Sequence, residues 1–172
     1  MQFLPMSRFP SGAIMKHRLS FLAALLAAAA FLSTPLHAQL LDAKVISLDA
    51  AKTIAAAAEA EAKKQGWTVA IAVVDISGGL ILFHRFDEVQ AASLDLAMAK
   101  ARTAARFKRS TKALSDGIAA GRLSLLAADG YLPLEGGVPV TVGGKVIGAV
   151  GVSGVTSEQD AIVAKAGAEA IR

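Results

Sequence analysis

Two pairs of apolar segments that fold back on themselves constrain this chain more than any other feature. Residues 67–75 (WTVAIAVVD) are almost wholly apolar and β-branched, and a short Ser-Gly-Gly turn separates them from residues 80–87. In the second pair, residues 138–142 and 145–152 flank Gly143-Gly144, which suits a type I′ turn. Two hairpins predict an antiparallel sheet, and strands that are apolar on both sides predict helices packed against each face.

Four helices are predicted from the spacing of apolar residues. They span residues 49–65, residues 93–107, residues 111–120 and a final segment that begins after Thr156 or Ser157. The first carries a Glu59–Lys63 pair at i,i+4. Ser93 is expected to cap the second helix, and Gln159 or Asp160 to complete a capping box at the last.

The stretch between the third helix and the second hairpin, residues 123–135, can hold either a short strand or an irregular loop. With that strand included, the order of elements predicts an α/β (α+β) fold. Its antiparallel five-stranded sheet would be flanked by helices on both faces.

The N-terminus has the organisation of a secretory signal peptide. A short basic stretch, residues 15–18, precedes an uncharged apolar run, residues 19–32, and small residues ending at Ala38 follow it. The run is shorter than the ~20 residues that span a bilayer, although an uncleaved anchor is the alternative. We expect residues 1–38 to be removed at export, with residues 1–14 as an upstream extension. The mature protein would then be periplasmic or secreted, with no membrane span.

Composition excludes several classes of protein and site. The leader holds three of the 18 basic residues and none of the 14 acidic ones, so the remainder has a net charge of +1 and predicts no nucleic-acid partner. The chain has no cysteine, which excludes disulfides and thiol catalysis. Only His84 lies outside the leader, so one subunit cannot offer a multi-histidine metal site. Residues 39–46 are expected to form a lead-in and residues 47–172 a single domain.

Two glycine-rich segments are candidates for a pocket wall. The segment GAVGVSG, residues 148–154, ends a strand and precedes a helix, where backbone amides near Ser153 can hold a carboxylate or phosphate. Its spacing is not G-x-G-x-x-G, so a dinucleotide site is not predicted. The alternative is that its glycines permit close strand and subunit packing. Residues 136–139 (GGVP) are either a pocket wall or a structural turn that places proline at the start of a strand.

His84 and Tyr131 are candidate axial ligands for a haem iron, because imidazole and phenolate both serve in that role. The alternatives are a hydrogen-bonded structural histidine and a tyrosine packed with its hydroxyl in water. Six basic residues between Lys100 and Lys112 form either a solvated face or a contact for an anionic ligand. No Ser-His-Asp motif is visible, so the catalytic residues, and whether the protein is an enzyme, stay open.

These segments together resemble the GlcG/HbpS haem-degrading-type domain family, to which the C-terminal domain of PduO-type proteins is related. The resemblance spans about residues 47–172 and rests on D-x-x-G-x-L, K-A-x-T-A, G-G-x-P-V and G-x-x-G-V-S-G in that order. It implies a profilin-like fold and assembly into homo-oligomers, from dimers to octamers. Some relatives bind haem, and some are linked to haem breakdown, corrinoid metabolism or glycolate utilisation.

The motifs and the basic segment supply the candidate ligand-binding residues. These are Lys100, Arg102, Thr103, Tyr131, Gly136, Gly137, Pro139, Gly151, Ser153 and Gly154. In the haem hypothesis Lys100 or Arg102 pairs with the propionates, while Tyr131 or His84 approaches the iron. Some exported relatives carry two acidic residues one helical turn apart for free iron. Here Asp95 is followed by Met98, so one carboxylate of that pair is missing.

Three functions follow from these observations. The first is an exported haem- or tetrapyrrole-binding oligomer that assists haem degradation or sequestration. The second is a binding or sensor module for a small organic acid or cofactor fragment, held by the amides near Ser153 without a metal. The third is a structural oligomer without a ligand.

Overall fold

Four antiparallel strands form the central sheet of the structure, a computed structural model that describes residues 43–171. The strand order across the sheet is β2-β1-β4-β3, so β2 and β3 are its edges. Both predicted hairpins are confirmed, and β1 and β4 pair antiparallel at the centre. The strands are β1 (Ala70–Asp75), β2 (Leu80–Arg85), β3 (Gly137–Val142) and β4 (Lys145–Ser153).

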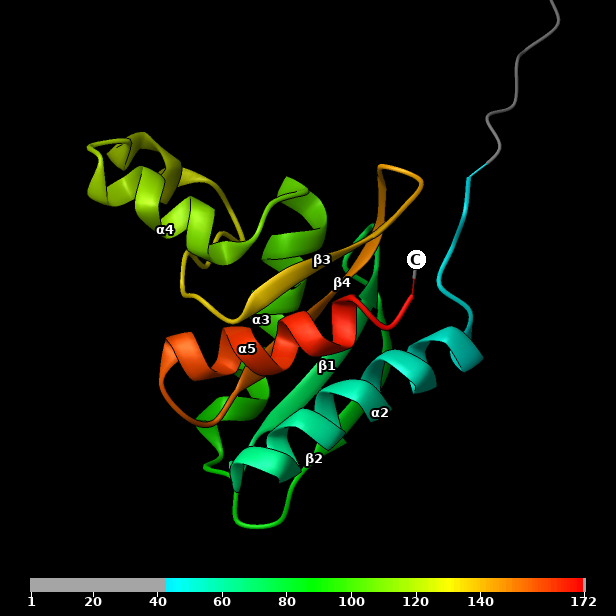
Figure 1. Cartoon of the computed structure of the whole chain (residues 1–172). Coiled ribbons are helices and arrows are strands. Elements are labelled where there is room, and N and C mark those ends of the chain that lie inside the picture. Colours follow the sequence, from blue (N-terminus) through cyan, green and yellow to red (C-terminus); the bar gives the residue numbers. More distant parts are fainter. Residues whose placement is uncertain (1–42, 172) are drawn as a thin grey trace, which may run out of the picture. The chain divides into compact units, whose positions relative to one another are not determined.

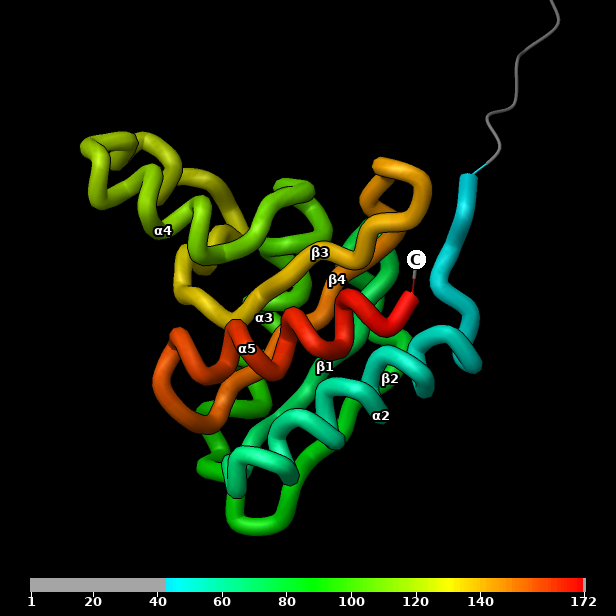
Figure 2. The backbone as a smooth tube through the Cα atoms, in the orientation of Figure 1, coloured from blue at the N-terminus to red at the C-terminus, as the bar shows by residue number. Residues whose placement is uncertain are grey.

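Helices cover both faces of this sheet, as Figures 1 and 2 show. Helices α2 and α5 pack against one face and against each other, and α3 packs against the opposite face. The helices are α2 (Leu48–Gln65), α3 (Ala92–Phe107), α4 (Thr111–Ala119) and α5 (Ser157–Ala168). The α3 face of the core is built mainly from alanines, whose short side chains let the helix lie close to the sheet.

Local signals account for most helix ends. The hydroxyl of Ser47 caps α2 by accepting from the amide of Ala50, and Gly66 ends that helix in the left-handed conformation at φ 70°. Thr156 and Gln159 form the predicted capping box of α5. The prediction for Ser93 was wrong: Ala91 precedes α3 without a side-chain cap, and Ser93 is buried within the first turn.

The predicted fifth strand is absent from the described residues. Instead, residues 123–127 form a short 3-10 helix, η1, whose Leu123 and Leu126 side chains are largely exposed. A strand here would need an open sheet edge beside it. The edge strand that follows in the chain, β3, contains Pro139, which has no backbone N–H, so it offers an incomplete edge. The sheet therefore has four strands, and the profilin-like assignment stays a prediction.

Several predictions concern residues that the structure does not describe. The expected signal peptide at residues 1–38, its upstream extension and the first half of the lead-in all lie outside residues 43–171. Within the described range, none of the helices combines the length and the hydropathy needed to span a bilayer.

Candidate functional site

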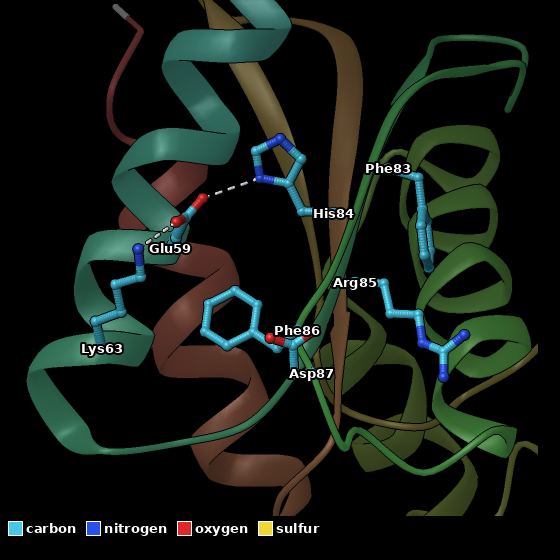
Figure 3. Close-up of a pocket in the computed structure, with 7 residues that line it drawn as sticks. All are labelled: Glu59, Lys63, Phe83, His84, Arg85, Phe86 and Asp87. Carbon is cyan, nitrogen blue, oxygen red and sulfur yellow. Dashed lines mark hydrogen bonds and ion pairs between the residues drawn. The ribbon is translucent and has the colours of Figure 1, made fainter.

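A surface pocket of about 520 Å³ lies at the outer edge of β2. Its volume falls within the ~300–1,000 Å³ typical of ligand sites. Helix α2 contributes Glu59 and Lys63, and the remaining lining is the continuous segment Phe83 to Asp87. In Figure 3, His84 and Phe86 lie on the α2 side of the strand and Phe83 and Arg85 on the other side, so the pocket wraps around the strand edge.

His84 is held in a defined orientation by α2. Its Nδ1 lies 3.1 Å from Oε2 of Glu59, and its side chain is 37% exposed. The other carboxylate oxygen of Glu59 accepts a hydrogen bond from Lys63, which lowers the pKa of Glu59, and the nearby His84 acts in the same direction. An ionised Glu59 can only accept, so Nδ1 of His84 carries a proton, and in the neutral imidazole the lone pair is on Nε2.

The contact between His84 and Glu59 is the arrangement expected of a metal-ligating histidine. A histidine that ligates a metal through one ring nitrogen usually donates its other N–H to a carboxylate. Among residues 43–171, however, no group of three or more histidine, aspartate or glutamate side chains could hold a bare ion. An iron that brings its own four equatorial nitrogens, as in haem, needs only an axial ligand from the protein.

Tyr131, the other candidate axial ligand, lies on the opposite side of the sheet. Its ring contacts Phe107 edge-on at a centroid distance of 4.9 Å, and its hydroxyl donates to the carbonyl of Leu114 over 3.3 Å. Thr103 of α3 holds the adjoining loop by hydrogen bonds to Gly130 and Leu132. One protomer therefore does not bring Tyr131 and His84 together.

Lys100 lies in the core as half of an ion pair. Its Nζ is 2.7 Å from Oδ2 of Asp160 and 3.0 Å from the carbonyl oxygen of Val152, and both charged side chains are at most 2% exposed. Burial raises the pKa of Asp160, while the hydrogen bond from Lys100 acts in the opposite direction. Asp160 joins α5 to α3, a role that its place in the first turn of α5 did not indicate. Lys100 offers no charge to solvent in the protomer, and its predicted contact with a propionate stays a prediction.

The glycines of the motifs allow close packing around this ion pair. A methyl group on Gly136 would lie 2.8 Å from Nζ of Lys100, and one on Gly137 would meet the Lys100 carbonyl. A methyl group on Gly151 would collide with the backbone of α3, and one on Gly154 with the backbone before β1. These contacts favour the packing interpretation of Gly151 and Gly154 and a structural role for Gly136 and Gly137.

Pro139 has a different environment from the motif glycines. It lines a second hollow, of about 570 Å³, beside β3 and α5. It therefore lies apart from the pocket that contains His84.

The amides near Ser153 already have partners. Ser153 is buried, the amide of Val155 donates to Asp160, and the amide of Thr156 donates to the side chain of Gln159. The start of α5 is thus capped by its own residues, which leaves fewer donors for an anion than the sequence suggested.

Arg102 and Arg106 hold the β1–β2 turn from α3. Nε of Arg102 donates to the carbonyl of Gly78 over 3.3 Å, and Nε of Arg106 donates to that of Ser77 over 2.8 Å. Both side chains are exposed, and neither guanidinium lies within 4 Å of a carboxylate of the described residues.

Sequence reasoning found His84 but missed its surroundings. The Glu59–Lys63 pair was predicted only as a helix-stabilising contact, and Phe86 carried no signal of its own. The i,i+4 spacing shows that Glu59 and Lys63 share a helix face, but only the packing of α2 on β2 shows which strand residue that face meets.

The fold and the pocket together define a class: an antiparallel α/β protein with a single carboxylate-oriented imidazole on an edge strand. The family model described as "Haem degrading protein HbpS-like" matches residues 46–169, and the chain belongs to this HbpS-like family. Protein GlcG of Escherichia coli strain K12 is 44% identical over 109 residues, covering 63% of this chain and 81% of GlcG.

Solved structures agree with this assignment. Protein ORFY of Klebsiella pneumoniae has a TM-score of 0.72 at 33% identity, covering 78% of this chain and 96% of ORFY. A double mutant of HbpS from Streptomyces reticuli has the same score and identity, covering 81% of this chain and 98% of that one. A PduOC–haem complex has a TM-score of 0.67 at 28% identity, covering 75% and 96%.

Proposed function

We propose that this chain is an exported haem- or tetrapyrrole-binding protein and that His84 provides the axial ligand. The observation that carries the proposal is the contact between Nδ1 of His84 and Glu59, which leaves Nε2 free in a partly exposed pocket. Support comes from membership of the HbpS-like family and from the PduOC–haem complex, a relative that binds haem.

The pocket offers groups that match the other parts of a haem. The Phe86 ring, on the same side of the strand as His84, would contact the apolar edge of the macrocycle, and the Lys63 side chain would neutralise a propionate. Glu59 would act as a positioning residue that fixes the tautomer and ring orientation of His84. Any oxidative chemistry in haem breakdown would be supplied by the bound iron, while these residues bind and orient it.

Hemin titration tests the proposal. The wild-type protein should give a saturable Soret shift, and His84→Ala should abolish it. Tyr131→Phe is the matched control, because Tyr131 lies on the opposite side of the sheet and its replacement should leave the shift unchanged. Glu59→Gln should weaken binding by about 10–100-fold while keeping the shift, as expected for loss of a hydrogen bond behind a metal ligand. A His84→Ala variant that binds hemin like the wild type would overturn the assignment.

A second candidate function, recognition of a small organic acid, is favoured by Arg102 and Arg106. Each uses Nε for a backbone carbonyl, which leaves its two terminal nitrogens for a carboxylate. Thermal-shift measurements with glycolate as the probe should show stabilisation that disappears in Arg102→Gln. Equal shifts in the wild type and the variant would remove this candidate.

Export and self-assembly are part of the proposal. A mass spectrum of the protein recovered from cells should show a chain beginning near Gln39. A chain that still begins at Met1 or Met15 would refute export. The third function, a ligand-free structural oligomer, predicts neither a hemin signal nor a glycolate signal.

A further inference from the structure

The segment around α4 and η1 exposes apolar side chains instead of burying them. No residue from Ser115 to Glu135 is buried, although this stretch is rich in leucine. Leu123 and Leu126, both on η1, are 62% and 56% exposed. Figure 1 shows α4 and the segment that follows it, in yellow-green, projecting to one side of the sheet. We call residues 108–127 the arm, and η1 its tip.

The base of the arm is held firmly by hydrogen bonds. The hydroxyl of Thr111, a buried residue, accepts from the amide of Gly137 over 2.8 Å and donates to its carbonyl over 3.4 Å. Beyond the tip, the Tyr131 hydroxyl donates to the carbonyl of Leu114. These contacts fix both ends of the projection to the body of the domain. The exposure of its leucines is therefore a feature of the folded protein.

The charge of the arm is mainly positive. Residues 108–127 contain four basic residues and one acidic residue, a net charge of +3. Lys112 pairs with that acidic residue, Asp116, at 2.8 Å. The remaining three, Lys108, Arg109 and Arg122, are exposed, and none forms an ion pair with another of the described residues. The unpaired charges that accompany the exposed leucines are therefore all cationic.

We propose that the arm docks on the surface of an anionic lipid bilayer. Leu123 and Leu126 enter the boundary between headgroups and acyl chains, and the unpaired basic residues meet the headgroup phosphates. A second copy of the arm is a poorer occupant, because a two-fold contact would place two groups of charge +3 against each other. A protein partner would need about 800 Å² of matching surface, far more than a tip with two exposed leucines provides.

The proposal does not rest on the proposed function. Helix α4 contacts β3, which is the opposite edge of the sheet from β2 and the pocket that contains His84. Hemin binding and bilayer docking therefore use different surfaces and can fail separately.

A fluorophore at the tip tests the docking directly. The chain has no cysteine, so Ser124→Cys carries a single environment-sensitive dye at an exposed position of η1. Vesicles of phosphatidylglycerol should shift its emission to the blue, whereas vesicles of phosphatidylcholine should not. Ala60→Cys, at an exposed position on α2, is the matched control and should show no shift. Equal shifts at the two positions, equal shifts with the two lipids, or no shift at Ser124→Cys would overturn the proposal.

Vesicle co-sedimentation separates the apolar and the electrostatic contributions. Leu123→Gln/Leu126→Gln keeps the charge and should weaken binding at least tenfold. Arg109→Gln should weaken it about fivefold, which corresponds to the ~1 kcal/mol of one basic residue near an anionic surface. Lys52→Gln, an exposed charge on α2, is the matched control and should bind like the wild type. A double variant that binds like the wild type, or equal losses in Arg109→Gln and Lys52→Gln, would refute the arrangement.

Two further measurements identify a different occupant or a failure of the other proposal. A blue-shifted dye at Ser124→Cys without vesicles, returning to the red on dilution, would show that another copy covers the tip and would overturn the docking. Hemin titration of Leu123→Gln/Leu126→Gln should give the wild-type Soret shift. A protein that docks on vesicles but gives no Soret shift would end the proposed function and leave the docking standing.

Discussion

Removing Asp160 should destabilise the protein severely. In Asp160→Ala, the ammonium group of Lys100 stays in a site where its side chain is 1% exposed and keeps only the carbonyl oxygen of Val152 as an acceptor. Breaking a buried ion pair in this way costs about 3–5 kcal/mol, a large part of the ~5–15 kcal/mol that holds a typical domain folded. The melting temperature should fall by on the order of 10 °C.

The double variant Lys100→Met/Asp160→Ala separates charge burial from packing. Methionine fills much of the lysine volume and leaves no unpaired charge, so the double variant should recover at least ~2 kcal/mol of the loss. The unfolding free energies come from urea titrations of the wild type, both single variants and the double variant, and together they give the coupling energy. A cost below ~1 kcal/mol for Asp160→Ala, or a double variant no more stable than the single variants, would refute the reasoning.

Two further predictions concern packing and pH. Gly151→Ala should cost about 1–3 kcal/mol because its methyl group would collide with the backbone of α3. Gly117→Ala should be neutral or stabilising by up to ~1 kcal/mol, because Gly117 is helical and the added methyl group would make only an ordinary contact, 3.8 Å, with the Arg122 side chain. Thermal melts that rank the two alike would contradict this. Glu59 has a lowered pKa because Lys63 donates to it, so its contribution to stability is present above about pH 4.3 and is lost as the pH falls through the folded-state pKa. The stability difference between wild type and Glu59→Gln should therefore shrink in acid, and urea titrations showing a constant difference would exclude the effect.

Local sequence signals predicted most of the secondary structure. The apolar runs and Gly-Gly turns located both hairpins, and the Thr156–Gln159 capping box is present as predicted. The fifth strand was predicted wrongly because LSLLAADG has the apolar content of a strand, but in the fold its first residues form the 3-10 helix η1 and pair with neither edge strand. Hydropathy cannot report whether a partner strand is available.

The candidate site was predictable only in part. His84 stood out because it is the one histidine outside the leader, but Glu59 lies 25 residues before it and became its partner only through the packing of α2 on β2. Lys100 and Asp160 are 60 residues apart, and no periodicity links them. The glycines of the G-G-x-P motif suggested a ligand-binding loop. In the fold, Gly136 instead packs against this ion pair, and a side chain at that position would collide with Lys100 and Asp160.

The position of His84 on an edge strand determines how a ligand can approach it. Among the described residues, the sheet has no strand on the outer side of β2, so a planar ligand could reach Nε2 from the side without separating β2 from β1. A histidine on β1 or β4 would have strands on both sides, and a ligand could reach it only by displacing a helix from one face of the sheet.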